Sequence, residues 1–280
     1  MIAFGASPSK ADKRDLKDYG VQAMPFPISS SINPDVLNID ERYQRKIGVC
    51  VACAVTTYVE YLYYVKTGTY TKLSVAFCYQ VIKKFVDKNT TEGSSLRSGI
   101  TVAMKYGICK ESTMLTNYNL THEQFLAQQI PEGAFTEALN YRIGGYFAVP
   151  IEQSLLAGTL YKYNLILTRY EVGNKWYSPS WLPKDIFPLV SSNPVASGHA
   201  VVQHAYNLKD KPRFDFLNWW SGNWGNRGTG WSYIDDYAPT EAFVLTLESQ
   251  AHLLVDNSPL IDESFISKIM KILRALKITY

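Results

Sequence analysis

A long apolar stretch runs from Cys50 to Val65, and Glu60 is its only charged residue. A helix that is apolar on nearly all sides is a buried one, so this pattern predicts a central buried helix that ends at Gly68. Cys50 would lie in its first turn, where unpaired backbone N–H groups and the helix dipole favour a thiolate and lower the pKa. Gln44, six residues earlier, can direct an amide N–H at the same point, as an oxyanion hole requires.

The rest of the first half also carries helical signals. Apolar residues recur at helical spacing after Ser74, which is a good N-cap. Ser95 can cap a further helix that runs to Tyr106 and closes at Gly107. The segment 121–124 has the spacing of a capping box and opens another short helix. The first half is therefore predicted to be mainly helical.

From about Tyr141 the pattern changes to short β-branched or aromatic runs that are separated by turn residues. A helical half followed by a half of antiparallel strands predicts an α+β protein. One helix, at 151–163, is expected within the second half. The predicted strands cover 146–150, 164–171, 200–206, 213–219, 230–234 and 242–247.

Composition narrows the function classes. With 280 residues, of which 46% are hydrophobic, the chain can bury a large core. A net charge of +3 is too small to indicate nucleic acid as a partner. The N-terminus lacks the apolar core of a signal peptide, so we expect an intracellular protein, cytoplasmic or packaged in a viral particle if the source is viral. Four cysteines are few for this length, and we expect them to be reduced.

Two later segments add candidate chemistry. His199 stands in G-H-A-V-V, 149 residues after Cys50, and Asn218 opens N-W-W-S-G-N-W-G-N-R-G. A cysteine nucleophile needs a base within hydrogen-bond reach, and the base needs a third group that holds its ring in the productive tautomer. His199 and Asn218 fit these two roles, and Trp220 would shield their hydrogen bond from water.

In this order, the three segments resemble the papain-like cysteine peptidases, the family of papain and the cathepsins. The third segment matches the family pattern N-S-W-G-x-x-W-G-x-x-G at Asn218, Trp220, Trp224, Gly225 and Gly228. The resemblance implies a papain-like two-lobe α+β fold. Its N-terminal lobe would be helical and its C-terminal lobe antiparallel and β-barrel-like, with the active-site cleft between them.

The resemblance also implies peptide hydrolysis, as an endopeptidase, through an acyl-enzyme. Cys50 would be the nucleophile, His199 the base, Asn218 its orienter and Gln44 the oxyanion donor, with no metal and no cofactor. Substrate backbone would lie along Gly93 and Ser94, although the loop 92–95 also reads as an ordinary connector. Three departures from the family pattern, Val51, Trp219 and Ser221, remove no catalytic atom.

Residues 1–255 are expected to form one peptidase domain. It would comprise an N-terminal strap at 1–43, a helical lobe at about 44–140 and a β lobe at about 141–255. The strap is short and rich in Pro, Ser and charge, which suits a segment on the surface better than an inhibitory domain. The tail at 256–280 contains a basic amphipathic stretch, 264–280, that could dock on its own body, bind a protein partner or lie on a membrane.

Other interpretations remain open. The pair Cys50 and Cys53 forms a C-x-x-C, which also occurs in redox and zinc sites. Cys53 can itself be aligned with the family's nucleophile, but it would lie almost a turn deeper in the helix, where the dipole effect fades. A catalytically idle assembly protein, or an acyltransferase with the same triad, would have the same residues. The sequence leaves the natural substrate and the oligomeric state undecided.

Overall fold

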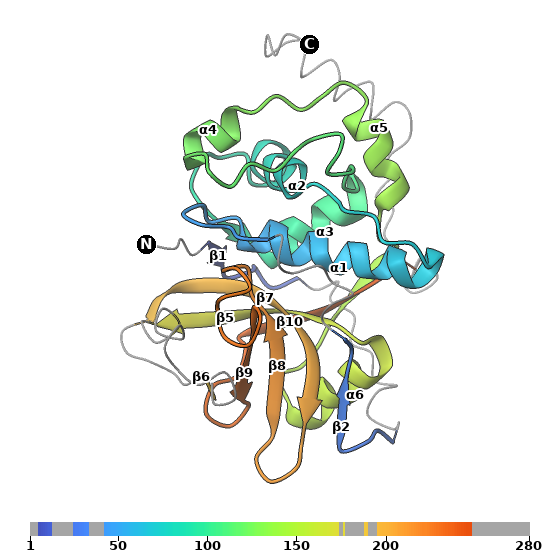
Figure 1. Ribbon diagram of the computed structural model, residues 1–280, viewed down its shortest axis with the longest axis vertical. Coiled ribbons are helices and arrows are strands. Elements are labelled where there is room, and N and C mark those ends of the chain that lie inside the picture. Colours follow the sequence, from blue (N-terminus) through green and yellow to red (C-terminus); the bar gives the residue numbers. More distant parts are fainter. Residues whose placement is uncertain are drawn as a thin grey trace.

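The computed structural model describes residues 5–12, 25–33, 42–173, 176, 188–189 and 195–247. Helices form one lobe of the molecule and most strands form the other (Figure 1). The predicted mixture of a helical half and an antiparallel half is confirmed. The expected amphipathic stretch at 264–280 lies outside the described residues.

The helical lobe is built on α1, which begins at Cys50 and ends at Gly68, where φ is 71°. The left-handed cap and the helix start agree with the sequence pattern. Ser74, Ser95 and Thr121 each accept a backbone N–H at the start of a helix, and Thr121 completes a capping box with Gln124. The helical segments are α1 (Cys50–Thr67), α2 (Val75–Val81), the π-helix η4 (Ile82–Asp87), α3 (Leu96–Lys105), α4 (His122–Ala127), α5 (Ala134–Ala138) and the 3₁₀ helix η5 (Leu139–Tyr141).

The one charge on α1 is buried and paired. Glu60, 1% exposed, accepts hydrogen bonds from Arg42 Nη2 at 2.5 Å and from the backbone of Leu73 at 2.7 Å. Tyr70 donates to its other oxygen, and Arg42 also donates to Thr57 Oγ1. The ion pair thus ties the segment before α1 and the turn after it to the middle of the helix. This network lets a carboxylate lie inside an otherwise apolar lobe.

The second lobe is an eight-stranded sheet. Seven of its strands follow the order β4-β10-β5-β7-β8-β9-β6, and the eighth, β2, lies off this path and pairs with β7. Its pairs are antiparallel except β6 with β9. α6 (Gln153–Tyr163) packs on this sheet. Within the described residues the sheet does not close, so the expected barrel-like lobe is corrected to an open sheet. The strands are β2 (Ser29–Ser31), β4 (Gly145–Ala148), β5 (Ile166–Gly173), β6 (Pro188–Leu189), β7 (Val195–Asn207), β8 (Arg213–Leu217), β9 (Thr229–Tyr233) and β10 (Glu241–Thr246).

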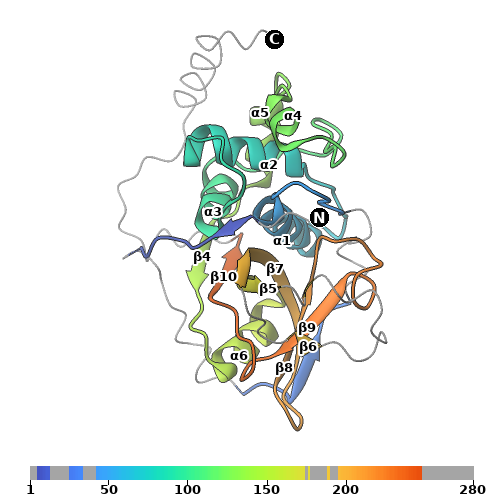
Figure 2. The same ribbon diagram turned by 90° about the vertical axis from the view of Figure 1, so that its left-hand side faces the viewer.

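The N-terminal segment differs from the surface strap expected from its composition. β1 (Ala6–Ser7) pairs in parallel with β3 (Ser94–Ser95) of the helical lobe and also contacts β7 of the sheet lobe. It lies where the two lobes meet (Figure 2). Gly5 and Ala6 are buried, and Ala6 is only 2% exposed. Close backbone approach, which composition does not report, buries Gly5 and Ala6, whereas most other described residues of the segment are exposed.

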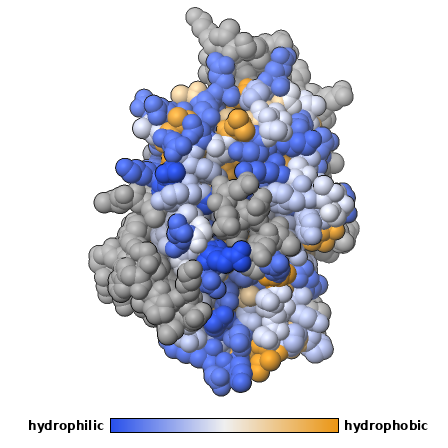
Figure 3. Space-filling model, viewed as in Figure 1, coloured by the Kyte–Doolittle hydropathy of each residue, from blue (hydrophilic) through white to orange (hydrophobic). Residues whose placement is uncertain are grey.

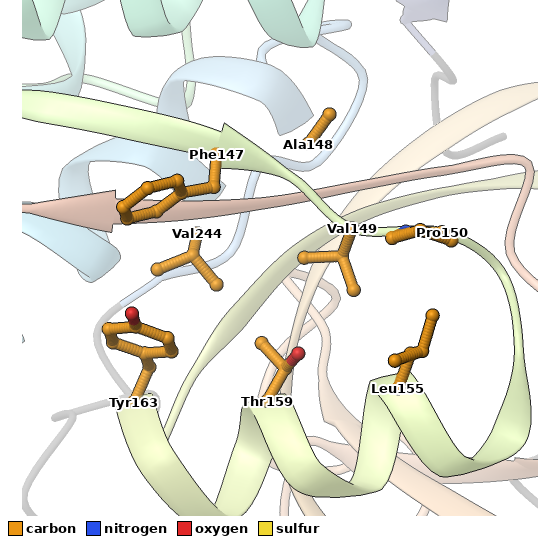
Figure 4. A pocket seen from close by; sticks show the side chains of 8 residues that line it. All are labelled: Phe147, Ala148, Val149, Pro150, Leu155, Thr159, Tyr163 and Val244. Atoms are coloured by element: carbon orange, nitrogen blue, oxygen red, sulfur yellow. The ribbon is translucent and has the colours of Figure 1, made fainter. Parts of the chain in front are cut away.

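On the face in Figure 3, apolar residues form small separate patches among hydrophilic ones. A small apolar cavity of about 20 Å³ lies between α6 and the strands β4 and β10, with Phe147, Val149, Leu155 and Tyr163 among its walls (Figure 4). That volume holds about one water molecule. Across the described ranges, none of the helices has both the length and the apolar composition that a bilayer crossing requires.

Candidate active site

Cys50 begins α1 and faces the sheet lobe. Its sulfur is within hydrogen-bond reach of its own backbone, of Val51 and, across the junction of the lobes, of Ala200 on β7. Ala200 is the residue after His199, and Trp219 Nε1 donates to its carbonyl at 2.8 Å. The structure therefore brings together two of the three sequence segments that carried the prediction. The side chain is 0% exposed.

His199 and Asn218 form the hydrogen bond expected from the sequence. His199 Nε2 lies 2.8 Å from Asn218 Oδ1, and both side chains are fully buried. The same oxygen accepts the backbone N–H of Trp219 at 2.8 Å, which identifies it as the acceptor atom of the amide. Nε2 must then carry the ring proton, and in a neutral imidazole Nδ1 is left as the basic nitrogen. This tautomer can take a proton from a thiol.

Aromatic rings enclose the imidazole. Trp220 lies 5.0 Å from the His199 ring, as expected for a shield against water. Trp176 packs edge-on against the same ring at 5.5 Å, and its backbone carbonyl accepts from Trp224 Nε1 at 2.9 Å. The sequence analysis missed Trp176, because no motif surrounds it. Its only signal is that it is an isolated tryptophan between two predicted strands.

Gln44 lies next to the site but its side chain is engaged within its own loop. Its backbone N–H donates to Trp219 O at 2.9 Å, which ties it to the Asn218 segment. Its side-chain Nε2 donates to Ile47 O at 3.2 Å, and the residue is buried. An amide NH₂ has two hydrogens, and this bond uses one of them. The role of Gln44 as an oxyanion donor stays a prediction.

The protein's own N-terminal segment lies beside Cys50, between β3 and β7, and the space that it fills is named the groove. The Gly5 carbonyl accepts the N–H of Ser94 at 2.5 Å, and the Gly5 backbone is close enough to Cys50 to lower the pKa of its thiol. The loop with Gly93 and Ser94, which the resemblance implied as the substrate-binding edge, is thus paired with a peptide chain as strand β3. Its binding of substrate remains a prediction.

Three glycines allow this close passage. A Cβ on Gly5 would collide with the backbone of Gly48, and a Cβ on Gly93 would collide with the backbone of Gly5. A Cβ on Gly198 would strike the carbonyl oxygen of Ala6. Gly93 also has φ of 84°, which other residues rarely adopt. The groove is therefore narrow enough at this point to admit main chain alone.

Side chains of the helical lobe hold the loop 92–94 in place beside the groove. Gly93 is fixed on both sides, since its N–H donates to Tyr79 OH at 3.0 Å and its carbonyl accepts from Lys83 Nζ at 2.9 Å. Glu92 accepts the N–H of Gly48 at 2.6 Å and so links this edge to the loop before Cys50. The sequence analysis did not identify these partners, because Tyr79 and Lys83 lie in helical segments and stand in no motif.

Burial keeps the Cys50 thiol and the His199 imidazole neutral in this state. Burial raises the pKa of the Cys50 thiol to about 11, and hydrogen bonds with Ala200 and Gly5 offset this only in part. Burial also lowers the pKa of His199 to about 4, against the opposing bond to Asn218. The structure thus differs from the lowered Cys50 pKa expected from the helix dipole. Desolvation is the larger effect here, and the N-terminal segment contributes to it.

No disulfide joins Cys50 to Cys53. All four cysteines of the chain are free and buried. Burial raises the pKa of Cys53 to about 12, and its sulfur lies 3.9 Å from Tyr118 OH. Among the described residues no group of three His, Cys, Asp or Glu side chains is arranged to hold a metal ion.

Comparisons with known proteins identify the fold of this chain. No protein-family model matches the chain, and no curated protein matches it. Among solved structures, xylellain, a cysteine protease from Xylella fastidiosa, matches with a TM-score of 0.76 at 22% identity, over 88% of this chain and 96% of xylellain. Procathepsin L 3 from Tenebrio molitor larval midgut matches with a TM-score of 0.67 at 16% identity, over 87% of this chain and 76% of its own.

The chain has the papain-like fold. The Amb a 11 cysteine protease of ragweed pollen, in its proform, has this papain-like fold too, with a TM-score of 0.63 at 14% identity, over 84% of this chain and 71% of that one. In the papain-like fold of this chain, Cys50 and His199 come from opposite lobes, as the resemblance implied.

Proposed function

We propose that the chain is a thiol-dependent peptidase that uses Cys50, His199 and Asn218. The observation that carries this proposal is the 2.8 Å contact between His199 Nε2 and Asn218 Oδ1, made where β7 packs against α1, the helix that begins at Cys50. A thiol, a base and an orienting group at one junction are what nucleophilic catalysis requires, which supports the proposal. Solved cysteine proteases with the same fold support the assignment.

In the proposed reaction, Cys50 transfers its proton to His199 Nδ1 and its sulfur attacks a peptide carbonyl carbon. The Cys50 N–H and the Gln44 side chain stabilise the negative charge that develops on the carbonyl oxygen. The imidazolium then protonates the leaving amine, the C–N bond breaks and a thioester remains. His199 next takes a proton from water, whose oxygen attacks the thioester, and the thiol is regenerated as the acid product leaves.

The segment in the groove supports an endopeptidase. Main chain runs past Cys50 from Gly5 into β1, so an extended stretch of peptide fits beside the nucleophile. The glycine contacts show that the groove receives main chain closely at this point. We therefore extend the proposal to cleavage within extended, unstructured peptide segments.

The test must use a protein whose groove is open. Gly5→Ala serves this purpose, because the added Cβ would collide with backbone atoms of Gly48. A peptidyl epoxide should then shift the intact mass by one stoichiometric adduct, and a peptide library should be cleaved to acid products. Cys50→Ala in the same background should show neither result.

The roles of the other two residues predict a graded loss. His199→Ala should remove turnover, whereas Asn218→Ala should retain more of it, because an imidazole keeps part of its function without its orienter. Melting curves establish that both variants fold. Equal loss in both folded proteins would contradict the orienting role, and absence of turnover in Gly5→Ala itself would favour an idle papain-like fold.

A further inference from the structure

A buried cation lines the groove next to the N-terminal segment. Arg169 lies on β5 and is 3% exposed. Its Nη1 donates to Glu171 Oε1 at 2.5 Å and to Thr240 Oγ1 at 2.8 Å, and these bonds fix the guanidinium plane. Its Nε donates in the third direction, to the carbonyl oxygen of Ala6 at 2.9 Å. One N–H of a rigid fork is therefore aimed at the chain in the groove.

Departure of the N-terminal segment would remove this acceptor. A peptide that takes this course beside Cys50 must displace Gly5 and Ala6, because Gly5 packs against Gly48 and Ala6 packs against Gly198. Arginine stays protonated and cannot respond by losing its charge. A buried N–H without an acceptor is unfavourable, so an incoming peptide that supplies an oxygen at the place of Ala6 O gains affinity over one that does not.

The residues around Arg169 determine which kind of acceptor oxygen can take the place of Ala6 O. A Cβ on Gly198 would approach Ala6 O and the Arg169 guanidinium, so the space between Gly198 and Arg169 admits only main chain. The charge of Arg169 is balanced by Glu171 and by Glu241 Oε1, which is 4.0 Å from Nε. The site is therefore not a strongly positive pocket for acidic side chains. Glu241 also accepts the N–H of Ser9 at 2.8 Å, so a second charged side chain of this wall contacts main chain.

We propose that Arg169 is a substrate-binding residue of the groove, whose Nε–H binds a main-chain carbonyl oxygen of an extended peptide where the peptide passes Gly198. This rests on the proposed peptidase function. Arg169 would hold extended peptides by their main chain at this position, with little dependence on their side chains.

The test measures binding separately from chemistry. The probe is a fluorescein-labelled peptide with the sequence of residues 5–10, acetyl-Gly-Ala-Ser-Pro-Ser-Lys-amide, added to full-length protein that carries Gly5→Ala and Cys50→Ala. A second probe has a thioamide in place of the alanine carbonyl, because sulfur is a weaker acceptor of the same shape. Fluorescence anisotropy gives the Kd of each pair.

We expect the thioamide to weaken binding about tenfold when Arg169 is present. Adding Arg169→Gln should weaken the normal peptide by about the same factor and abolish the difference between the probes. Thr240→Val removes the Oγ1 bonds to Nη1 and to the Arg169 carbonyl but not the Nε–H, and it should leave the difference intact. Melting curves establish whether Arg169→Gln folds. If it does not, the Kd values of the two probes for the protein that retains Arg169 still test whether its Nε–H binds the carbonyl oxygen.

Equal Kd values for the two probes on the Arg169 protein, or no binding of either probe, would overturn the proposal. A difference between the probes that persists in folded Arg169→Gln would also overturn it. In Gly5→Ala protein that retains Cys50, Arg169→Gln should raise KM with little change in kcat. If the probes bind as expected but no peptide is hydrolysed, Arg169 still binds peptide main chain, and the peptidase function is rejected instead.

Discussion

Cys50 and Cys53 are three residues apart in α1, and different parts of the molecule cover their side chains. Cys50 lies at the helix start and is covered partly by Gly5, a residue of a different and separately held segment. Cys53 is covered by the core of the helical lobe and by Tyr118. Burial raises the pKa of both thiols, but only the cover of Cys50 can be removed without unfolding the lobe.

We therefore expect substoichiometric iodoacetamide at pH 6 to label Cys50 in Gly5→Ala protein and to label neither cysteine rapidly in the wild type. Peptide mapping identifies the adduct. The control is Gly5→Ala with Cys50→Ala, which should remain unlabelled at Cys53. Labelling mainly at Cys53, or turnover that survives Cys50→Ala but not Cys53→Ala, would reverse the assignment and remove the role given to Gln44.

Single residues near the site were predictable where a local pattern specified them. Cys50, His199, Asn218 and Trp220 stand in motifs, and their positions agree with expectation. Arg169 was not predictable, because it occupies an ordinary position in a strand. Its burial is explained by Ala6, which is 163 residues away in the chain. A partner at that separation leaves no periodic trace in the sequence.

At the scale of elements, α1 combines an apolar surface with one internal ion pair. Glu60 accepts from Arg42 and from the backbone of Leu73, so the carboxylate joins three segments. The sequence predicted the buried helix from its apolar residues, and it gave no partner for Glu60. Removing one member of such a pair leaves the other charge buried and uncompensated.

Glu60→Gln should therefore lower the free energy of unfolding by about 3–5 kcal/mol, because Arg42 stays charged inside the lobe. Urea denaturation followed by circular dichroism measures this loss. The matched control replaces both partners, as Arg42→Met with Glu60→Met, and should cost less than Glu60→Gln alone. A Glu60→Gln protein as stable as the wild type would show that solvent reaches Arg42.

The element β1 is held in the groove by bonds to both lobes. Gly5 O accepts from Ser94, Ala6 O accepts from Arg169, and Ser9 N donates to Glu241. A substrate competes with these bonds, so the fraction of molecules with an open groove reduces the apparent affinity. Short strands without apolar alternation were missed by the sequence analysis for the same reason as Arg169: their stabilising contacts are all distant in the chain.

Opening the groove should raise activity. Gly5→Ala introduces a collision with the Gly48 backbone, and we expect kcat/KM for a short peptide to rise at least about tenfold. Ser7→Ala is the matched control, since Ser7 is an exposed residue of the same strand and its change should have little effect. Equal activity of wild type and Gly5→Ala would show that the segment leaves the groove readily in solution.

For the whole molecule, burial of the His199 imidazole makes stability depend on pH. Burial lowers the pKa of His199 to about 4, below the ordinary value of 6.5 that it regains on unfolding. Between these values the unfolded chain binds more protons than the folded one, so the free energy of unfolding rises with pH. The stabilisation is present above pH 6.5 and is lost as the pH falls toward 4.

We expect this single group to cost about 2 kcal/mol of stability between pH 7 and pH 5. Carboxylates and His204 also titrate in acid, so the wild type is compared with His199→Gln, which lacks the titration but is otherwise similar. The mutant should lose less stability over this interval in urea denaturation. Parallel losses in the two proteins would mean that His199 is more accessible to solvent than its burial indicates.

The course of the N-terminal segment also bears on synthesis at the ribosome. Ser9 bonds to Glu241, 232 residues later in the chain. At about 5–20 residues per second, the nascent chain waits roughly 10–50 seconds between making the first of these residues and the second. α1 and the helices around it can fold during that interval, whereas the groove cannot be filled until the last strands emerge. The segment beside Cys50 is thus translated before the strands that hold it and is among the last parts to find its place.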